Sequence, residues 1–156
     1  MLFLRALLSF LLLPGIVALI VPPLIGAHDP TRGTTVMAGA VLMGIGFALL
    51  LWCVRDFYEA GKGTLAPWDP PKNLVTVGLY RYTRNPMYVA VLALVGGWAL
   101  YYQSLYLTAY VMLLAIGFHI RVVVAEEKWC ADTFGDAWDQ YAAQVSRWLP
   151  LKKGRA

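Results

Sequence analysis

The chain has 156 residues, of which 60% are hydrophobic and 14% charged, and its net charge is +4. Soluble domains average about half apolar and about a quarter charged residues, and here the apolar residues run in long blocks, so the composition indicates a single membrane-embedded domain over residues 1–156. The basic residues form no stripe suited to nucleic acid, and Cys53 and Cys130 have neither disulfide-framework nor metal-site spacing.

The first apolar block, about residues 2–27, contains three prolines and predicts a kinked transmembrane helix. Arg5 followed by an apolar core also fits a secretory signal peptide. However, the bulky Ile25 stands at the −3 position of the cleavage point after Ala27, where a small residue is needed. We therefore expect this block to be retained as a span.

The second block, about residues 34–54, predicts another span, in which Ala40 and Gly44 are small enough for close helix packing. Residues 55–86 form the longest polar segment, and their glycines and prolines predict a turn-rich loop rather than a helix. A loop of this length in so small a protein is more often functional than a plain connection.

The third and fourth blocks, about residues 87–102 and 105–125, predict two further spans. Only Gln103 and Ser104 separate them, so we expect a tight antiparallel hairpin. The fold class predicted is all-α, a polytopic membrane protein with about four transmembrane helices and a C-terminal amphipathic helix.

That amphipathic helix is expected in the tail, residues 126–156. Four apolar residues spaced by three, four and three positions mark its buried face: Trp138, Tyr141, Val145 and Trp148. Few other apolar residues occur there, so the helix is expected to lie on the membrane interface and not to cross it.

Lysine and arginine set the expected orientation, because cytoplasmic loops carry an excess of both. With four spans, the two termini and the loop 55–86 share one side, which holds most of the 13 basic residues. The other side holds only Arg32. The termini and the middle loop are therefore expected in the cytoplasm.

Two polar groups stand out at the ends of the hairpin spans: residues 78–88, with two arginines and three tyrosines, and the pair Glu126 and Glu127. Residues of an antiparallel hairpin whose numbers add to about 207 lie at equal depth, which sets Arg81 opposite Glu126. The two groups are therefore expected to meet at one membrane face.

Residues seven apart share a face of an α-helix, so His119 and Glu126 are expected to project together. Arg121 and Glu127 are expected to point elsewhere, although the arginine side chain is long enough to swing. Each residue alone is equally well explained as an interfacial anchor. Together, two carboxylates, three arginines and several tyrosines at one depth exceed what anchoring needs, and ionisable groups at a span are usually functional.

The sequence lacks the motifs of several kinds of enzyme. It has no Ser-His-Asp order of a serine hydrolase, no cysteine nucleophile with a partner, no ligand spacing of a zinc site and no phosphate-binding loop. The pair Gly61 and Gly63 follows no strand, so it is not a dinucleotide fingerprint. A transferase that positions two ligands and a non-catalytic binding protein remain.

The order and spacing of these motifs resemble the integral-membrane methyltransferases, the family of isoprenylcysteine carboxyl methyltransferase and the phospholipid N-methyltransferases. The resemblance is carried by Gly78-x-Tyr80-x-x-x-Arg84-Asn85-Pro86-x-Tyr88, Glu126-Glu127, Phe134-Gly135, Tyr141 and Arg147-Trp148-Leu149-Pro150. It covers about residues 60–150 and is similar to a bacterial branch, which implies a multi-pass protein of the bacterial inner membrane. Asn85 replaces the histidine that is more usual in this family.

The resemblance implies S-adenosylmethionine as methyl donor, bound on the cytoplasmic side, and an acceptor that arrives from the bilayer. The acceptor expected is a lipophilic small molecule or lipid-modified group, with a carboxyl or an amine as the methylated group. The residues implied for the cofactor are Leu79, Tyr80, Arg84, Asn85, Pro86, Tyr88, Glu126, Glu127, Tyr141 and Arg147.

Within that set, Glu126 or Glu127 would hold the amino group or ribose hydroxyls, and Arg84 or Arg147 would pair with the carboxylate. The three tyrosines would donate hydrogen bonds or pack on the adenine. The residues implied for catalysis are Arg121, which matches an arginine near the acceptor, and His119 or Glu126 as the base for an amine or hydroxyl acceptor.

Two other functions stay open. A nicotinamide-dependent membrane reductase has a related fold, but its extra spans do not fit in 156 residues. A non-catalytic membrane scaffold would lose only stability when Glu126 and Glu127 are replaced, whereas an enzyme would lose cofactor binding.

Overall fold

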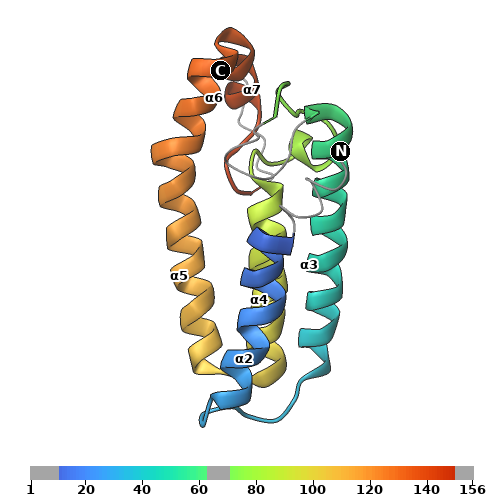
Figure 1. The fold of residues 1–156 in the computed structure, drawn as a ribbon, viewed down its shortest axis with the longest axis vertical. Helices are drawn as coiled ribbons and strands as arrows, with labels where there is room; N and C mark the ends of the chain where they lie inside the picture. The colour runs from blue at the N-terminus through green and yellow to red at the C-terminus, as the bar shows by residue number, and fades with distance from the viewer. Residues whose placement is uncertain (1–10, 63–70, 150–156) are drawn as a thin grey trace.

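The structure, a computed structural model, describes residues 11–62 and 71–149, and within these ranges every regular element is a helix (Figure 1). The helices in chain order are η1 (Leu11–Ile20), α2 (Val21–His28), α3 (Met37–Asp56), η2 (Phe57–Gly61), η3 (Gly78–Arg81), α4 (Pro86–Tyr102), α5 (Leu105–Arg121), η4 (Val122–Glu126), α6 (Glu127–Phe134) and α7 (Asp136–Gln144). The segments η1, η2 and η4 are π-helical and η3 is a 3₁₀ turn. The predicted all-α class is confirmed for the described chain.

Two continuous helices are long and apolar enough to cross a membrane: Met37–Gly61, with 25 residues, and Leu105–Phe134, with 30. The shorter apolar helices Pro14–His28 and Pro86–Tyr102 occupy two of the other predicted spans. Length and composition thus support two of the four predicted transmembrane helices. The start of the first predicted span lies outside the described residues.

Helices α3 and α4 pack closely because glycines remove side chains from their contact. A Cβ added to Gly39 would lie 2.3 Å from the Tyr101 backbone nitrogen, and one added to Gly46 would lie 2.6 Å from that of Leu94. Gly44, expected from the sequence to serve this purpose, faces open space instead. Small residues on one helix face are the usual means of close approach between membrane helices.

The predicted tight hairpin between α4 and α5 is confirmed. Gln103 ends α4 in the left-handed conformation (φ 46°), and the Ser104 side chain caps α5 by accepting a hydrogen bond of 3.0 Å from the Leu107 backbone N–H. The Ser104 hydroxyl also donates to Asp29, which accepts bonds from the backbone N–H and hydroxyl of Thr31 at 2.7 and 2.6 Å. Asp29 therefore joins the loop after α2 to the hairpin turn.

The polar loop begins later than predicted. The helix of α3 continues through η2 to Gly61, and Lys62 ends it in the left-handed conformation (φ 51°). Arg55 and Glu59, one turn apart, form an ion pair of 3.0 Å that supports this added turn. Residues 63–70 of the predicted loop lie outside the described chain.

The tail also differs from its prediction. Helix α5 continues without a break through η4 and α6 to Phe134, and Gly135 (φ 51°) then turns the chain into α7. Trp138 and Tyr141 lie on α7, but the helix ends at Gln144, so Val145 and Trp148 lie beyond it in extended and bent backbone. The predicted stripe is therefore wrong in its second half.

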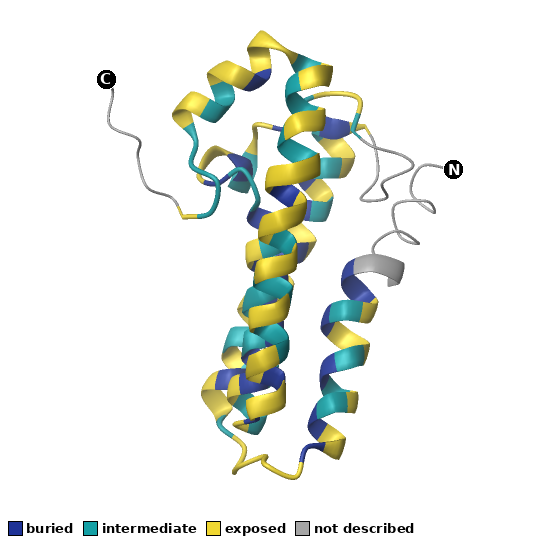
Figure 2. Cartoon of the chain, turned by 90° about the vertical axis from the view of Figure 1, so that its left-hand side faces the viewer, coloured by how far each residue is buried: buried dark blue, intermediate teal, exposed yellow. Residues whose placement is uncertain are grey.

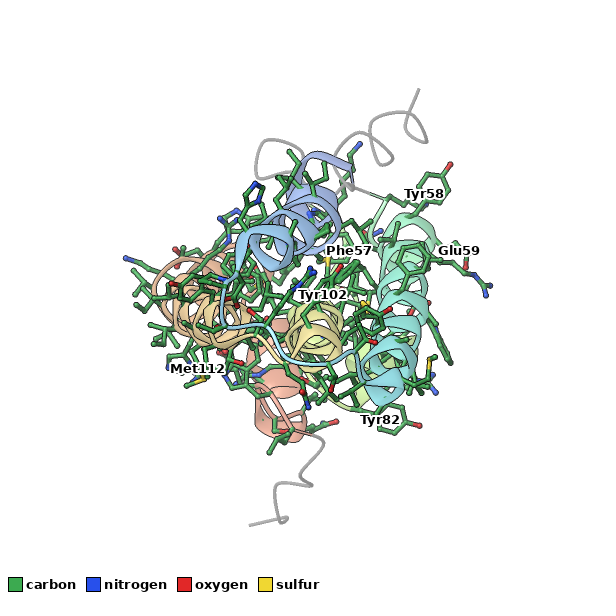
Figure 3. The ribbon with its side chains drawn as sticks, turned by 90° about the horizontal axis from the view of Figure 1, so that it is seen from below. Phe57, Tyr58, Glu59, Tyr82, Tyr102 and Met112 are labelled. Atoms are coloured by element: carbon green, nitrogen blue, oxygen red, sulfur yellow. The ribbon has the colours of Figure 1, made fainter. Side chains whose placement is uncertain are left out.

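Most residues on the outer faces of the helices are exposed (Figure 2), and these include large apolar residues of α5 such as Met112, Leu113 and Ile116. When the bundle is viewed along the helix axes (Figure 3), the side chains of Tyr58 and Met112 point outward and that of Phe57 points inward. Apolar side chains that face outward along a long helix are expected in a bilayer, whose lipid tails cover them.

Candidate active site

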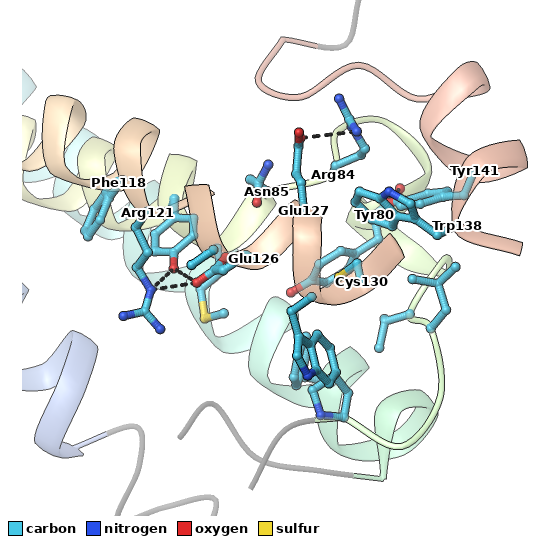
Figure 4. Close-up of a pocket in the computed structure, with 18 of the residues that line it drawn as sticks. Tyr80, Arg84, Asn85, Phe118, Arg121, Glu126, Glu127, Cys130, Trp138 and Tyr141 are labelled. Carbon is cyan, nitrogen blue, oxygen red and sulfur yellow. Dashed lines mark hydrogen bonds and ion pairs between the residues drawn. The ribbon is translucent and has the colours of Figure 1, made fainter. Parts of the chain in front are cut away.

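A cavity of about 540 Å³ lies at the end of the helix bundle where α3 and α5 end and α4 begins (Figure 4). This volume lies within the range of about 300–1,000 Å³ that is typical of small-molecule pockets. All three π-helical segments contribute to its wall: Pro14 and Val17 from η1, Phe57 from η2, and Glu126 from η4. The segments η2 and η4 have five residues each and continue α3 and α5, and single π turns of this kind often occur at functional sites.

Most of the predicted site residues line this cavity. They are Tyr80, Arg84, Asn85, Tyr88, Arg121, Glu126, Glu127 and Tyr141. Four other predicted residues, Leu79, Pro86, His119 and Arg147, do not appear in its wall. Leu79 packs against the Tyr80 core, Pro86 is buried at the start of α4, and the last two make contacts described below.

The first polar group in the cavity, which we call the Glu127 cluster, consists of Glu127, Arg84 and Arg147. An Arg84 terminal nitrogen lies 3.2 Å from Glu127 Oε1. Arg147 donates from Nε to Oε1 and from a terminal nitrogen to Oε2, both at 2.7 Å. Such bidentate pairs are the stronger kind of ion pair, and these hydrogen bonds raise the pKa of Arg147 above its usual value.

Arg84 is the most enclosed member of this cluster, since its side chain is 9% exposed. Its guanidinium carbon lies 5.4 Å from the ring centroid of Trp138, a favourable cation–π distance. Its Nε is buried and has no hydrogen-bond partner among the described residues. An unpaired buried donor is costly, so this N–H is a natural contact for an anionic or carbonyl oxygen in the cavity.

The second polar group, which we call the Glu126 cluster, consists of Glu126, Arg121 and Tyr88. Arg121 Nε lies 2.7 Å from Glu126 Oε1 and 3.1 Å from the Tyr88 hydroxyl, which itself donates to the same carboxylate oxygen. Dashed lines in Figure 4 mark the contacts of this cluster, and a separate dashed line marks the Arg84–Glu127 pair.

A π turn builds the Glu126 cluster and brings Arg121, expected from α-helical spacing to point elsewhere unless its side chain swings, onto the same side as Glu126. The Glu127 N–H bonds to the Val122 carbonyl, five residues back, where an α-helix would have used residue 123. The extra residue in this turn rotates Glu126 toward Arg121. For the same reason, His119 and Glu126 no longer lie on one face of the helix, as their seven-residue spacing had predicted.

His119 lies instead on the exposed outer side of α5. Its Nδ1 accepts a hydrogen bond of 3.2 Å from Trp148 Nε1, and the two rings lie 6.1 Å apart. Nothing in the described chain joins His119 to Glu126, so the two predicted bases are separate.

An aromatic wall faces the Glu127 cluster. Tyr141 donates a hydrogen bond of 2.7 Å to the Tyr80 carbonyl, and burial raises the pKa values of both tyrosines above their usual range. Tyr80 is 5% exposed, and its hydroxyl has no partner among the described residues. Trp138, whose ring centroid lies 5.9 Å from that of Tyr141, also lines the cavity, as do Trp129 and Phe134.

Sequence reasoning missed the other wall of the cavity, which is apolar. It comes from three different helices: Pro14 and Val17 of η1, Met87 and Val91 of α4, and Phe118 of α5. These residues look like ordinary span residues in the sequence. Only the packing of η1 beside α4 and α5 shows that they continue the site.

Residues 34–137 match the sequence profile of the family described as phospholipid methyltransferase. The chain belongs to this phospholipid methyltransferase family. The matched region holds both hairpin helices, Arg84 and the glutamate pair, and it ends just before Trp138. No curated protein and no solved structure gave a significant match. Membership implies a membrane methyltransferase, and the predicted family is thereby confirmed.

Proposed function

We propose that this phospholipid methyltransferase family member transfers a methyl group from S-adenosylmethionine to an amine or carboxyl group of a lipid-like acceptor. The supporting observation is a single cavity with an aromatic, arginine-containing end and an apolar end, separated by two adjacent glutamates. A methyltransferase needs both ends, because a polar cofactor and a lipophilic acceptor must meet within bonding distance.

The cofactor fits the end that holds the Glu127 cluster. Two buried polar atoms at this end lack hydrogen-bond partners within the described chain, Arg84 Nε and the Tyr80 hydroxyl. The cofactor carboxylate would accept a hydrogen bond from Arg84 Nε, and a hydroxyl or amine of the cofactor would bond to the Tyr80 hydroxyl. Its ammonium group would pair with Glu127. The rings of Trp138 and Tyr141 would cover the adenine or the sulfonium, which is a cation suited to aromatic faces.

The acceptor fits the other end. Its chain would lie along the apolar wall of Pro14, Val17, Val91 and Phe118, and its polar group would reach the Glu126 cluster. This wall lies between the N-terminal helix and α5, whose outer faces are apolar, so the bilayer is the expected source of the acceptor.

Bound S-adenosylmethionine supplies a methyl group carried on a positively charged sulfur. The chain aligns the acceptor with that methyl group and shields both from water, and alignment alone removes about 7–11 kcal/mol of barrier in favourable cases. For an amine acceptor, Glu126 is the base proposed to take up the proton, because it lines the cavity, whereas His119 is held outside by Trp148. A carboxylate acceptor needs no base.

We place the cavity on the cytoplasmic side of the membrane, in a multi-pass topology. The support is the charge pattern: basic residues gather at the end of the bundle that holds the cavity, whereas Arg32 lies beyond the opposite end. Labelling of single introduced cysteines in intact cells and in inverted vesicles tests this topology.

The function is tested by calorimetric titration of S-adenosylmethionine and S-adenosylhomocysteine into the detergent-purified protein. We expect saturable binding that Glu127→Ala weakens and that Arg55→Ala, a control at an exposed ion pair, leaves unchanged. Absence of binding to folded wild-type protein would contradict the proposal, and binding of a nicotinamide cofactor in its place would favour a reductase.

A further inference from the structure

Residues 145–149, which follow α7, form a non-helical segment that we call the strap. Val145 has extended backbone, and the following residues pass between residues 83–85 and the helix that contains His119 and Glu127. Contacts on both sides hold the strap in place, although none of its residues lines the cavity.

On one side, the strap is bonded to the segment that leads into α4. The Arg84 backbone N–H donates to the Ser146 carbonyl at 2.9 Å. The Arg147 carbonyl accepts two further bonds, from the Thr83 hydroxyl at 3.0 Å and from the Asn85 amide at 3.1 Å. Residues 83–85, which lead into α4, are thus hydrogen-bonded to the backbone carbonyls of two consecutive strap residues, Ser146 and Arg147.

On the other side, the strap is bonded to the long helix. The Arg147 guanidinium donates to both oxygens of Glu127, and Trp148 donates to His119. Arg147 therefore contacts Glu127 through its side chain and Asn85 through its main chain, and both of those residues line the cavity. Its own side chain is held by both oxygens of the Glu127 carboxylate.

We propose that Arg147 is a positioning residue, which orients Glu127 and the Arg84–Asn85 segment for the cofactor without contacting the cofactor itself. This inference rests on the proposed function. Asn85 is likewise proposed to be a positioning residue, because its side-chain amide donates a hydrogen bond to the Arg147 carbonyl and so holds the strap. The side chain of Glu127 is long and has several rotamers, and a bidentate partner fixes one of them before a ligand arrives.

The test compares Arg147→Ala, Arg147→Lys and the control Arg55→Ala by calorimetric titration with S-adenosylmethionine. We expect Arg147→Ala to weaken binding about tenfold, the equivalent of roughly 1.4 kcal/mol. Arg147→Lys should recover part of that loss, because an ammonium keeps one ion pair with Glu127 but not the bidentate geometry. No loss in Arg147→Ala, or no recovery in Arg147→Lys, would overturn the proposal.

A double substitution separates positioning from direct contact. If Arg147 acts through Glu127, then Arg147→Ala adds little to the effect of Glu127→Ala, because interacting residues are not additive. A further tenfold loss in the double variant would mean that Arg147 itself touches the cofactor, which contradicts the inference.

A measurement without cofactor keeps this inference distinct from the proposed function. Cys130 lines the cavity one turn beyond Glu127, whereas Cys53 is fully buried and does not line it. The rate of alkylation of Cys130 therefore reports how accessible the cavity wall beside Glu127 is. We expect faster alkylation of Cys130 in Arg147→Ala than in wild type or Arg55→Ala. Equal rates would overturn the positioning role, even if the wild-type protein bound no S-adenosylmethionine.

Discussion

Arg121 and Glu126 are five residues apart on one continuous helix, yet their side chains meet at 2.7 Å because a π turn lies between them. An α-helix takes about 3.6 residues per turn, and five residues would place the two side chains on different faces. The π turn thus sets a carboxylate against a guanidinium beside the apolar end of the cavity.

The first prediction concerns this carboxylate. Glu126→Gln keeps the shape of the side chain but removes its ability to take a proton, so we expect methyl transfer to an amine acceptor to fall about 10²–10⁴-fold. The affinity for S-adenosylmethionine should change little, because Glu126 belongs to the acceptor end. Radiolabelled methyl transfer into a lipid extract of the host membranes measures the first effect, and calorimetry the second. An unchanged rate would remove Glu126 as the base.

The second prediction concerns the close contact between α3 and α4. Gly46→Ala places a Cβ 2.6 Å from the Leu94 backbone nitrogen, so the two helices must move apart, at a cost of about 1–3 kcal/mol. Gly44→Ala on the same helix meets nothing within 4 Å and is the matched control. We expect a lower thermal unfolding midpoint in detergent for Gly46→Ala alone. Equal midpoints for the two variants would contradict the packing argument.

The sequence predicted the apolar helices and the hairpin of α4 and α5, because apolar blocks and the short turn at Gln103 and Ser104 are local signals. The depth relation of the hairpin also placed Arg84 close to the level of Glu127, and these residues form an ion pair of 3.2 Å. The depth relation depends only on helix rise and chain direction.

The remaining features depend on contacts that no local pattern encodes. A π turn has no distinctive composition, so the rotation of Glu126 toward Arg121 and away from His119 was not foreseen. The strap breaks the helical spacing of Val145 and Trp148 because its carbonyls bond to Arg84, Thr83 and Asn85, far away in sequence. Nonlocal hydrogen bonds of this kind override local periodicity.

The third prediction concerns Asp29 at the opposite end of the bundle. Burial acts to raise its pKa, but hydrogen bonds from Ser104 and Thr31 outweigh that effect and hold the pKa below its usual value of 3.8. A lowered pKa means that the carboxylate stabilises the fold above pH 3.8, and that this contribution is lost as the pH falls through the lower value.

Asp29→Asn should therefore lower the unfolding midpoint at neutral pH and flatten its decline under acid conditions. Thermal unfolding of the detergent-solubilised protein, from neutral pH down to values well below the usual carboxyl pKa of 3.8, measures both effects. Asp132→Asn, a change at an exposed aspartate, is the control. If the wild type and Asp29→Asn showed parallel acid profiles, the hydrogen-bonded carboxylate would not be the cause.

The fourth prediction concerns Tyr88, whose hydroxyl touches both Arg121 and Glu126. Tyr88→Phe keeps the ring, which packs on Phe118 with centroids 4.5 Å apart, and removes only the hydroxyl. We expect about a tenfold lower rate of methyl transfer, which corresponds to one charge-assisted hydrogen bond of roughly 1.4 kcal/mol. Cofactor affinity should stay close to that of the wild type, and a loss of cofactor affinity would instead place Tyr88 at the cofactor end.

The last prediction concerns the apolar end of the cavity. Val17 lines it, whereas Ile20 on the same helix is 52% exposed on the outer face. Val17→Trp would fill the space proposed for the acceptor chain, and Ile20→Trp adds the same ring where only lipid would meet it. If the acceptor lies along this wall, Val17→Trp raises the acceptor concentration needed for half-maximal rate by about tenfold or more, the effect of roughly 1.4 kcal/mol of lost binding. S-adenosylmethionine should bind both variants as it binds the wild type, because its proposed site lies beyond the two glutamates.

Equal acceptor dependence in Val17→Trp and Ile20→Trp would show that the acceptor reaches the Glu126 cluster by another route. A loss of cofactor binding in Val17→Trp alone would show that the two ends of the cavity are not separate sites.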